Sequence, residues 1–318
     1  MKTTADKRIG FICIAIATVL FSSMEITLKT LVDDFAPLQI TLARFLVGGL
    51  VLLAPALMRL RQKQLSITGR DLGRFLLLGF LGIVVSMNFY QLAITQINAS
   101  AVAVLFSSNP LFVTVLAYLL LGEVIYRRNV VGLLLDIVGI LCIINPLQMS
   151  INLPGTLCAL AATVAFALYG VGSKKTGQSH GALVVTCFGF LSGSLEMLLL
   201  TILSHVPAIA EFLLAHDLGL FARIPVLSGY SWQTLPAFLL VSVGVTGIGY
   251  TAYFIGMEKT SAATGSLVFF FKPVLATLLS VWILAEQIVP SMILGIAFML
   301  AGSLVTILPE LRRQKTAG

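Results

Sequence analysis

Residues 99–121 read ASAVAVLFSSNPLFVTVLAYLLL, and residues 262–284 read AATGSLVFFFKPVLATLLSVWIL. The two stretches together contain one charged side chain, Lys272. An α-helix needs about 20 apolar residues to cross the hydrocarbon core of a bilayer, so both stretches are predicted to be transmembrane helices. Asn109 and Pro110 stand at the same place in the first stretch as Lys272 and Pro273 in the second.

The composition extends this reading to the whole chain. Of the 318 residues, 58% are hydrophobic and 10% are charged, whereas a soluble globular chain is about 45–50% apolar and about 25% charged. This excludes a cytoplasmic enzyme, a disordered protein and a secreted disulfide scaffold. The four cysteines lie within apolar runs without C-x-x-C spacing, so neither a disulfide nor a metal site is predicted.

Ten apolar runs have lengths near that of a membrane span. We therefore predict an all-α polytopic membrane protein with ten transmembrane helices. The predicted spans are 9–31, 37–58, 75–95, 99–121, 130–147, 154–173, 181–203, 235–256, 262–284 and 291–308.

The basic residues predict the orientation. Sixteen lysines and arginines fall in the two termini and in alternate loops, and the other five loops contain one, Arg223. By the positive-inside rule, both termini and the tail 310–318 are expected in the cytoplasm, and the long loop 204–234 outside. The expected location is the cytoplasmic (inner) membrane, with multiple passes.

The chain contains an internal repeat. Residues 90–146 align without gaps on 253–309, at an offset of 163. Near the start of each half the offset is 145, so the second half carries an 18-residue insertion, assigned to the loop 204–234. That insertion is either a helix on the membrane surface or a solvated loop. The matched pairs are Tyr90 and Tyr253, Pro110 and Pro273, Glu123 and Glu286, Gly132 and Gly295, Gly139 and Gly302, and Pro146 and Pro309.

The repeat predicts an inverted topology. Each half, 1–147 and 154–309, contains five spans, and an odd number makes the second half enter the membrane from the opposite side. Inverted five-helix repeats are an architecture of secondary transporters.

The arrangement resembles the EamA type of the drug/metabolite transporter superfamily. The carrying segments are Ala43-Arg44-Phe45, Ser108-Asn109-Pro110-Leu111-Phe112, Leu121-Gly122-Glu123, Lys272-Pro273-Val274-Leu275-Ala276 and Leu284-Ala285-Glu286, with the four repeat glycines. The resemblance implies a central cavity lined mainly by spans 1, 3, 4, 6, 8 and 9. It leaves the substrate open, since the family carries amino acids, purines, sugars, drugs and other metabolites. Asp136, matched by Met299, departs from the apolar residue usual there.

Two polar residues are predicted at mid-depth. Lys272 and Asn109 each lie ten residues into their spans, about 15 Å deep from opposite sides. Repeat mates at mirrored depths should meet near the midplane, where inverted-repeat carriers bind substrate. The alternatives are a helix-packing hydrogen bond for Asn109 and a structural ion pair for Lys272, with Glu25 or Glu196 as partner.

Other intramembrane charges are candidates for gating or coupling. Glu25 precedes Lys29 by four residues on span 1, and Arg44 lies at similar depth on span 2, so both cations are candidate partners of Glu25. An outer gate and direct substrate contact both remain open for this group. Glu196 and Asp136 are both candidate proton carriers, with packing or an oligomer contact favoured for Asp136.

Polar edges on spans 3, 6 and 8 come from Asn88, Tyr90, Tyr169 and Tyr253, as substrate contacts or an interfacial belt. Glu123 and Glu286, at span ends, are expected to cap and dock the next helix.

The favoured function is secondary active transport of a small organic metabolite, amino acid-like or otherwise polar or anionic, by alternating access. A P-loop for ATP is absent from the sequence, and the three histidines, all expected in loops, lack metal-ligand spacing, so no cofactor or metal is predicted. The expected partners are the solute, the bilayer and either a proton or a counter-substrate, with no nucleic acid, in a monomer or homodimer. The alternative is a membrane-embedded enzyme acting on lipid-linked substrates, which would cluster catalytic groups at an interface. A channel is disfavoured because no ring of like charges or filter loop is seen.

Overall fold

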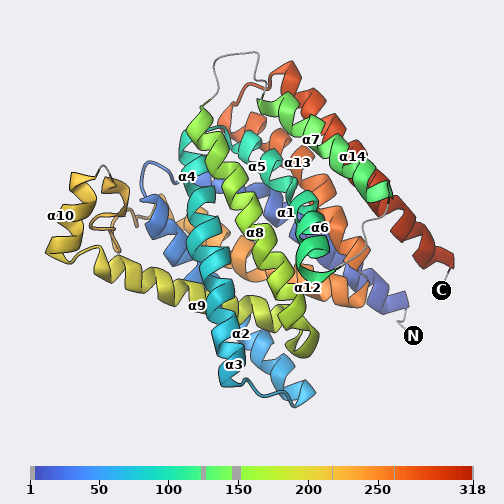
Figure 1. The fold of residues 1–318 in the computed structure, drawn as a ribbon, viewed down its shortest axis with the longest axis horizontal. Coiled ribbons are helices and arrows are strands. Elements are labelled where there is room, and N and C mark those ends of the chain that lie inside the picture. Colours follow the sequence, from blue (N-terminus) through green and yellow to red (C-terminus); the bar gives the residue numbers. More distant parts are fainter. Residues whose placement is uncertain (1–3, 123–126, 145–151, 217, 261, 317–318) are drawn as a thin grey trace.

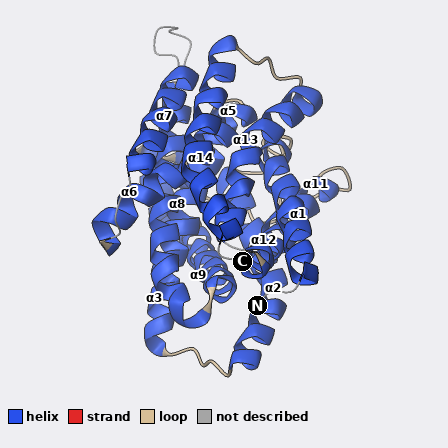
Figure 2. Cartoon of the chain, turned by 90° about the vertical axis from the view of Figure 1, so that its right-hand side faces the viewer, coloured by secondary structure: helices blue, strands red, loops and turns tan. Residues whose placement is uncertain are grey.

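The computed structural model describes residues 4–122, 127–144, 152–216, 218–260 and 262–316, and these contain helices and no strand (Figures 1 and 2). The start of α1 and the end of α14 lie near each other in both views. The helices are α1 (Thr4–Lys29), α2 (Pro37–Lys63), α3 (Gly69–Gly79), η1 (Phe80–Met87), α4 (Asn88–Gln96), α5 (Ala99–Ser107), α6 (Asn109–Leu121), α7 (Arg127–Ile144), α8 (Leu153–His180), α9 (Ala182–Leu203), α10 (Pro207–Ala215), η2 (Gly219–Phe221), α11 (Leu235–Leu239), η3 (Leu240–Gly249), α12 (Tyr250–Lys259), α13 (Ala262–Leu284) and α14 (Pro290–Thr316).

Eight helical segments are long and apolar enough to cross a membrane. Two shorter apolar helices, Val130–Ile143 and Pro290–Val305, coincide with the fifth and tenth predicted spans. Each of the ten predicted runs is thus mainly helical where the structure describes it. The sixth extends further than predicted, because α8 continues through Lys174 and Lys175 to His180.

The third predicted span of each half contains a π-helix. η1 joins α3 to α4, and η3 joins α11 to α12. The Thr246 hydroxyl donates to the Val241 carbonyl five residues earlier, at 2.8 Å, in keeping with the wider turn. π-Helical segments are uncommon and frequently stand at functional sites, and the hydrophobic pattern of the sequence did not predict either one.

The two matched prolines act differently. The fourth predicted span breaks at Ser108, so that α6 begins at Asn109 with Pro110 in its first turn, a position that needs no backbone donor. Its repeat mate Pro273 lies inside the continuous helix α13. The helix is therefore interrupted next to the proline in the first half and continuous through it in the second.

The two halves interleave. Helix α1 packs along α12 and α13, while α8 packs against η1, α4 and α6, and both lie in the middle of the bundle (Figure 1). Helix α2 contacts η3 and α9, and α9 in turn crosses α3 and η1. Each half therefore packs its first two spans against the other half's spans, which brings residues from distant parts of the sequence to one centre.

Helices α7 and α14 form the largest helix pair and run antiparallel. A Cβ built on Gly302 would lie 2.8 Å from the Gly132 carbonyl oxygen, and one on Gly139 would lie 2.8 Å from the Gly295 carbonyl oxygen. The contacts thus join the start of one helix to the later part of the other. Asp136 is buried in this seam beside Gly302, which places it in helix packing.

The insertion folds back over the end of α9. It contains the short helix α10 and the 3-10 turn η2. The backbone N–H of Arg223 donates to the Ser204 carbonyl at 2.9 Å, and the N–H of Ile224 donates to the Ser204 hydroxyl at 3.0 Å. The Gln39 amide at the start of α2 donates to the Val226 and Ser228 carbonyls, which fixes the loop to the first half.

Candidate functional site

A buried ion pair lies at the centre of the bundle. The Lys272 ammonium on α13 is 2.6 Å from Oε1 of Glu25 on α1, and the two side chains are 3% and 0% exposed. The helices α1 and α13 pack along each other, which brings Glu25, near the end of α1, to Lys272 in the middle of α13. An isolated charge in such a place is costly, so each side chain makes the other tolerable. Of the partners considered for Lys272, the structure selects Glu25.

Two aromatic side chains contact this ion pair directly. The Tyr90 hydroxyl on α4 donates to the same carboxylate oxygen, Glu25 Oε1. The Lys272 ammonium lies 5.2 Å from the centre of the Phe106 ring on α5, within the range of a cation–π interaction. The Tyr90 and Phe106 rings meet edge to face at 4.8 Å. The ion pair is therefore enclosed by spans 1, 3, 4 and 9.

Arg44 on α2 lies beside this group and is fully buried. Its carbon Cζ is 4.5 Å from the Phe45 ring centre and 5.9 Å from that of Tyr90. One nitrogen, Nη2, contacts the Met87 sulfur at 3.2 Å, a weak acceptor. The nitrogens Nε and Nη1 have no hydrogen-bond partner among the described residues.

Glu25 carries the complementary unsatisfied atom. Its oxygen Oε2 is buried without a partner in the described structure, although Oε1 accepts from both Lys272 and Tyr90. A buried polar atom without a partner is rare and needs an explanation. Unused donors on Arg44 and an unused acceptor on Glu25 therefore flank the Tyr90 side chain.

Of the cations considered as partners of Glu25, the structure pairs it with Lys272, and no ion pair joins it to Lys29 or Arg44 among the described residues. The Lys29 ammonium instead donates to the backbone carbonyls of Ile94 at 2.6 Å and Ile97 at 2.9 Å. These carbonyls lie at the end of α4 and just beyond it, where a helix leaves its carbonyls without internal donors. Lys29 thus ties α1 to the C-terminus of α4, away from the ion pair.

The remaining candidates divide between the centre and its surroundings. The Asn109 amide donates to the Thr163 carbonyl on α8 at 3.1 Å, and no hydrogen bond joins Asn109 to Lys272 among the described residues. Tyr169 is buried on α8 with its hydroxyl 3.4 Å from that of Thr186. Tyr253 is half-buried and packs edge to face on Phe269 at 6.2 Å.

Glu196 is separate from the centre. Its side chain on α9 is partly buried, its oxygen Oε2 has no partner, and no ion pair involving it occurs in the described part of the chain. Lys272 is paired with Glu25 instead. The alternative in which Glu196 neutralises Lys272 is therefore wrong, and its role as a proton carrier remains a prediction.

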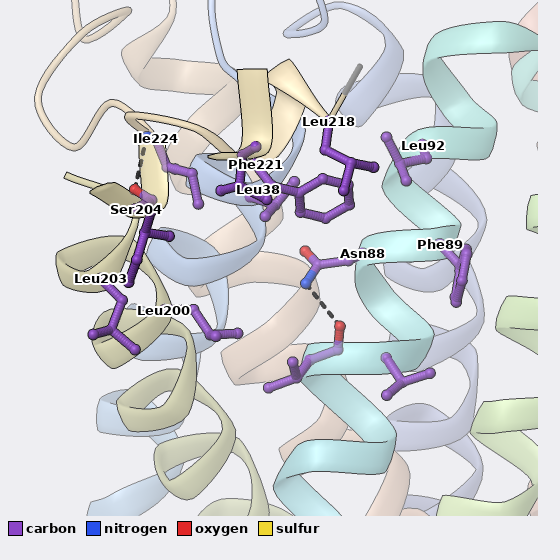
Figure 3. Close-up of a pocket in the computed structure, with 14 residues that line it drawn as sticks. Leu38, Asn88, Phe89, Leu92, Leu200, Leu203, Ser204, Leu218, Phe221 and Ile224 are labelled. Carbon is purple, nitrogen blue, oxygen red and sulfur yellow. Dashed lines mark hydrogen bonds between the residues drawn. The ribbon is translucent and has the colours of Figure 1, made fainter. Parts of the chain in front are cut away.

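Asn88 faces a different cavity. A space of about 470 Å³ lies between α4, the end of α9 and the insertion, and the Asn88 carboxamide extends from α4 toward it (Figure 3). The Asn88 amide donates to the Val84 carbonyl at 2.8 Å and contacts the Met197 sulfur at 3.1 Å. Asn88 and Tyr90, two positions apart, thus belong to different sites.

The structure differs in detail from the predictions for two polar residues outside the centre, Glu286 and His180. Glu286 does cap a helix, but that helix is α5 of the other half: its carboxylate accepts from the backbone N–H groups of Ala99 at 2.7 Å and Ser100 at 3.2 Å. Its repeat mate Glu123 lies outside the described residues. His180, expected in a loop, is the last residue of α8 and is buried 3.6 Å from Asp71.

Three residues of the centre were not among the candidate site residues predicted from the sequence. Phe45, Met87 and Phe106 contact the charged groups. Apolar side chains are abundant in every span, so nothing in the local pattern separates the few beside a charge from those that face lipid. Repeat symmetry offered one indication, because Phe106 and Phe269 are mates at the offset of 163.

The protein is a bundle of apolar helices whose two halves interleave around buried charged side chains. These features define a multi-pass membrane protein of the transporter class. The model of the EamA-like transporter family matches residues 8–145 and 153–308. The chain therefore belongs to the EamA-like transporter family of the drug/metabolite transporter superfamily.

Known proteins agree with this membership. An uncharacterized transporter of Clostridium kluyveri is 33% identical over 304 residues, which cover 93% of this chain and 92% of that protein. Protein PecM of Dickeya dadantii is 26% identical, covering 85% of this chain and 82% of its own. A crystal structure superposes with a TM-score of 0.63 at 21% identity, covering 98% of this chain and 99% of that one, which supports the fold.

Proposed function

We propose that this protein is a secondary active transporter that moves a small, amino acid-like metabolite across the cytoplasmic (inner) membrane by alternating access. The observation that carries the proposal is the enclosed group of Glu25, Lys272, Tyr90 and Arg44, in which charges are sealed from both sides of the bundle. Intramembrane charges of this kind mark substrate and ion pathways.

The proposed architecture is ten spans in two inverted five-helix repeats, 1–147 and 154–309, with both termini and the tail 310–318 in the cytoplasm. Antiparallel packing of α7 on α14 through the repeat glycines supports the inversion, because helices with matched sequences then point in opposite directions. The distribution of basic residues supports the orientation.

The unsatisfied atoms support the substrate class. Arg44 offers two unpartnered donors that suit a carboxylate, and Glu25 offers one unpartnered acceptor that suits an ammonium or hydroxyl group. Both flank Tyr90. A solute that carries an anionic group and a donor group would satisfy all of these atoms at once, whereas a solute with only one of the two would leave a buried atom unpaired.

The coupling follows from competition for Glu25. Its carboxylate is shared by Lys272 and Tyr90, so an arriving ammonium or proton must change those contacts. Transport is then driven by a proton gradient or by exchange with a counter-substrate, without ATP. Coupling through Glu25 needs no contribution from Glu196, which remains a separate candidate.

The test is uptake of radiolabelled L-amino acids into liposomes that contain purified protein and no nucleotide. An imposed pH gradient should drive accumulation if protons are coupled, and internal unlabelled substrate should drive it if exchange operates. Glu25→Gln should lower uptake at least tenfold, because the substitution removes the charge that binds both Lys272 and the substrate donor.

Glu211→Gln is the matched control, because Glu211 is an exposed glutamate on α10, and its uptake should equal that of the wild type. Amino acid amides, which lack the anionic group, should compete at least tenfold more weakly than the parent acids. If amides compete equally well, or if Glu25→Gln transports normally, the proposed binding site is incorrect.

A further inference from the structure

The cavity beside Asn88 lies outside the central group. Neither Glu25 nor Lys272 lines this space of about 470 Å³, which is within the range of 300–1,000 Å³ typical of small-molecule sites. Successive residues of an α-helix turn by about 100°, so Asn88 and Tyr90 point to nearly opposite sides of α4. A molecule held here would thus occupy a second site.

The insertion builds one wall of the cavity. Apolar side chains come from Ile209 and Leu213 of α10. Leu218, Phe221 and Ile224 add to this wall, and Ser204 at the root of the insertion accepts a hydrogen bond from the Ile224 backbone N–H (Figure 3). The two repeat offsets show that this region carries 18 residues more than the first half. The cavity therefore depends on a segment that the repeat symmetry does not require.

One polar atom in this apolar space has no partner. Asn88 is 7% exposed, and its amide nitrogen is occupied by Val84 and Met197, while its carbonyl oxygen Oδ1 has no hydrogen-bond partner among the described residues. The carboxamide extends toward the cavity (Figure 3). An unsatisfied buried acceptor favours any occupant that brings a donor.

The lining defines the occupant. We propose that this cavity binds a neutral, largely apolar molecule that carries one O–H or N–H donor, which is directed at Asn88 Oδ1. No charged side chain is among the lining residues, so an ionised group would enter without a counter-charge. An acyl chain of a lipid would fill the apolar space, but it would leave Oδ1 without a donor.

The experiment compares two probes that differ in one hydrogen-bond donor. Tritiated 4-hexylphenol is bound to the full-length protein in nanodiscs, and 4-hexylphenol and 4-hexylanisole, its methyl ether, are used as competitors. For the wild type the phenol should compete about fivefold more strongly than the ether, as expected for one added hydrogen bond. In Asn88→Leu, which lacks the acceptor, that difference should disappear.

Matched cavity-filling variants locate the site. Leu213→Trp fills this cavity and should reduce saturable binding at least tenfold. Leu141→Trp fills a second apolar cavity, between α6, α7 and α8, and should bind as the wild type does; melting temperatures confirm that both variants fold. Equal competition by the phenol and the ether in the wild type would show that no donor is directed at Asn88 Oδ1 and would overturn the proposal. Unchanged binding in Leu213→Trp would also overturn it.

Discussion

Breaking the central ion pair from one side should destabilise the protein more than removing both charges. In Lys272→Met the apolar stem is kept and the ammonium is lost, so the Glu25 carboxylate, 0% exposed, is left without its counter-charge at 2.6 Å. Loss of one partner of a buried pair costs about 3–5 kcal/mol of unfolding free energy. In Lys272→Met/Glu25→Gln the charge disappears as well, and glutamine still offers an oxygen to the Tyr90 hydroxyl, so most of this loss should be recovered.

The measurement is equilibrium unfolding in mixed micelles, titrated with SDS. The control is Lys259→Met, which breaks the pair between Lys259 and Asp6, 2.5 Å apart but with side chains 33% and 38% exposed. Partly exposed pairs contribute at most about 1 kcal/mol, so this variant should lose little. If Lys272→Met is as stable as Lys259→Met, or if the double variant is no more stable than Lys272→Met, the ion pair does not have the energetic role argued here.

Three further predictions concern the orientation of the chain in the membrane and the packing of its helices. A cysteine introduced at Ser228 should react with a membrane-impermeant reagent from outside and one at Gln62 should not; the reverse result would refute the proposed orientation. Glu286→Ala should lower the unfolding free energy by about 1–3 kcal/mol, because two buried N–H groups at the start of α5 lose their acceptor, and an unchanged SDS midpoint would contradict that role. Gly302→Ala should be destabilising, because the added Cβ would lie 2.8 Å from a carbonyl oxygen of α7. The control is Gly73→Ala in α3, where the added Cβ meets open space and the protein should be stabilised by up to about 1 kcal/mol. Equal shifts of the two variants in the same assay would argue against close packing of α7 on α14.

The positions of the helices could be predicted from the sequence because they depend on local quantities. Run length decides whether a segment can cross a bilayer, and this needs no knowledge of its neighbours. Repeated glycines at 132, 139, 295 and 302 carried information on packing, since close backbone contact excludes a side chain. The family resemblance inferred from these motifs was confirmed by the family model, which matches residues 8–145 and 153–308.

The partners of the buried charges could not be predicted in the same way. The spacing of Glu25 and Lys29 satisfies the rule for a pair on one helix, yet Lys29 finds two carbonyls at the end of α4 instead. The choice depends on how α1 is rotated against α4 and α13, which is set by packing across the whole bundle. The same holds for the contact between Arg44 and Met87, where an arginine meets a thioether that no charge pattern indicates.

The central site is asymmetric although the two halves of the chain are repeats of each other. This asymmetry predicts which contact changes during transport. Tyr90 packs edge to face on Phe106, and its repeat mate Tyr253 packs edge to face on Phe269, the mate of Phe106. At the offset of 145, however, the position equivalent to Glu25 is Gly170, so only the first half has the acid. Helices α1 and α13 pack along each other, so under the proposed alternating access their ion pair should move as one unit. The bond from Tyr90 on α4 to Glu25 must then break, together with the hydrogen bonds from Lys29 to the end of α4. Tyr90→Phe removes that bond alone and should shift the ratio of outward- to inward-accessible cysteines, whereas an unchanged ratio would mean that Tyr90 moves together with the ion pair.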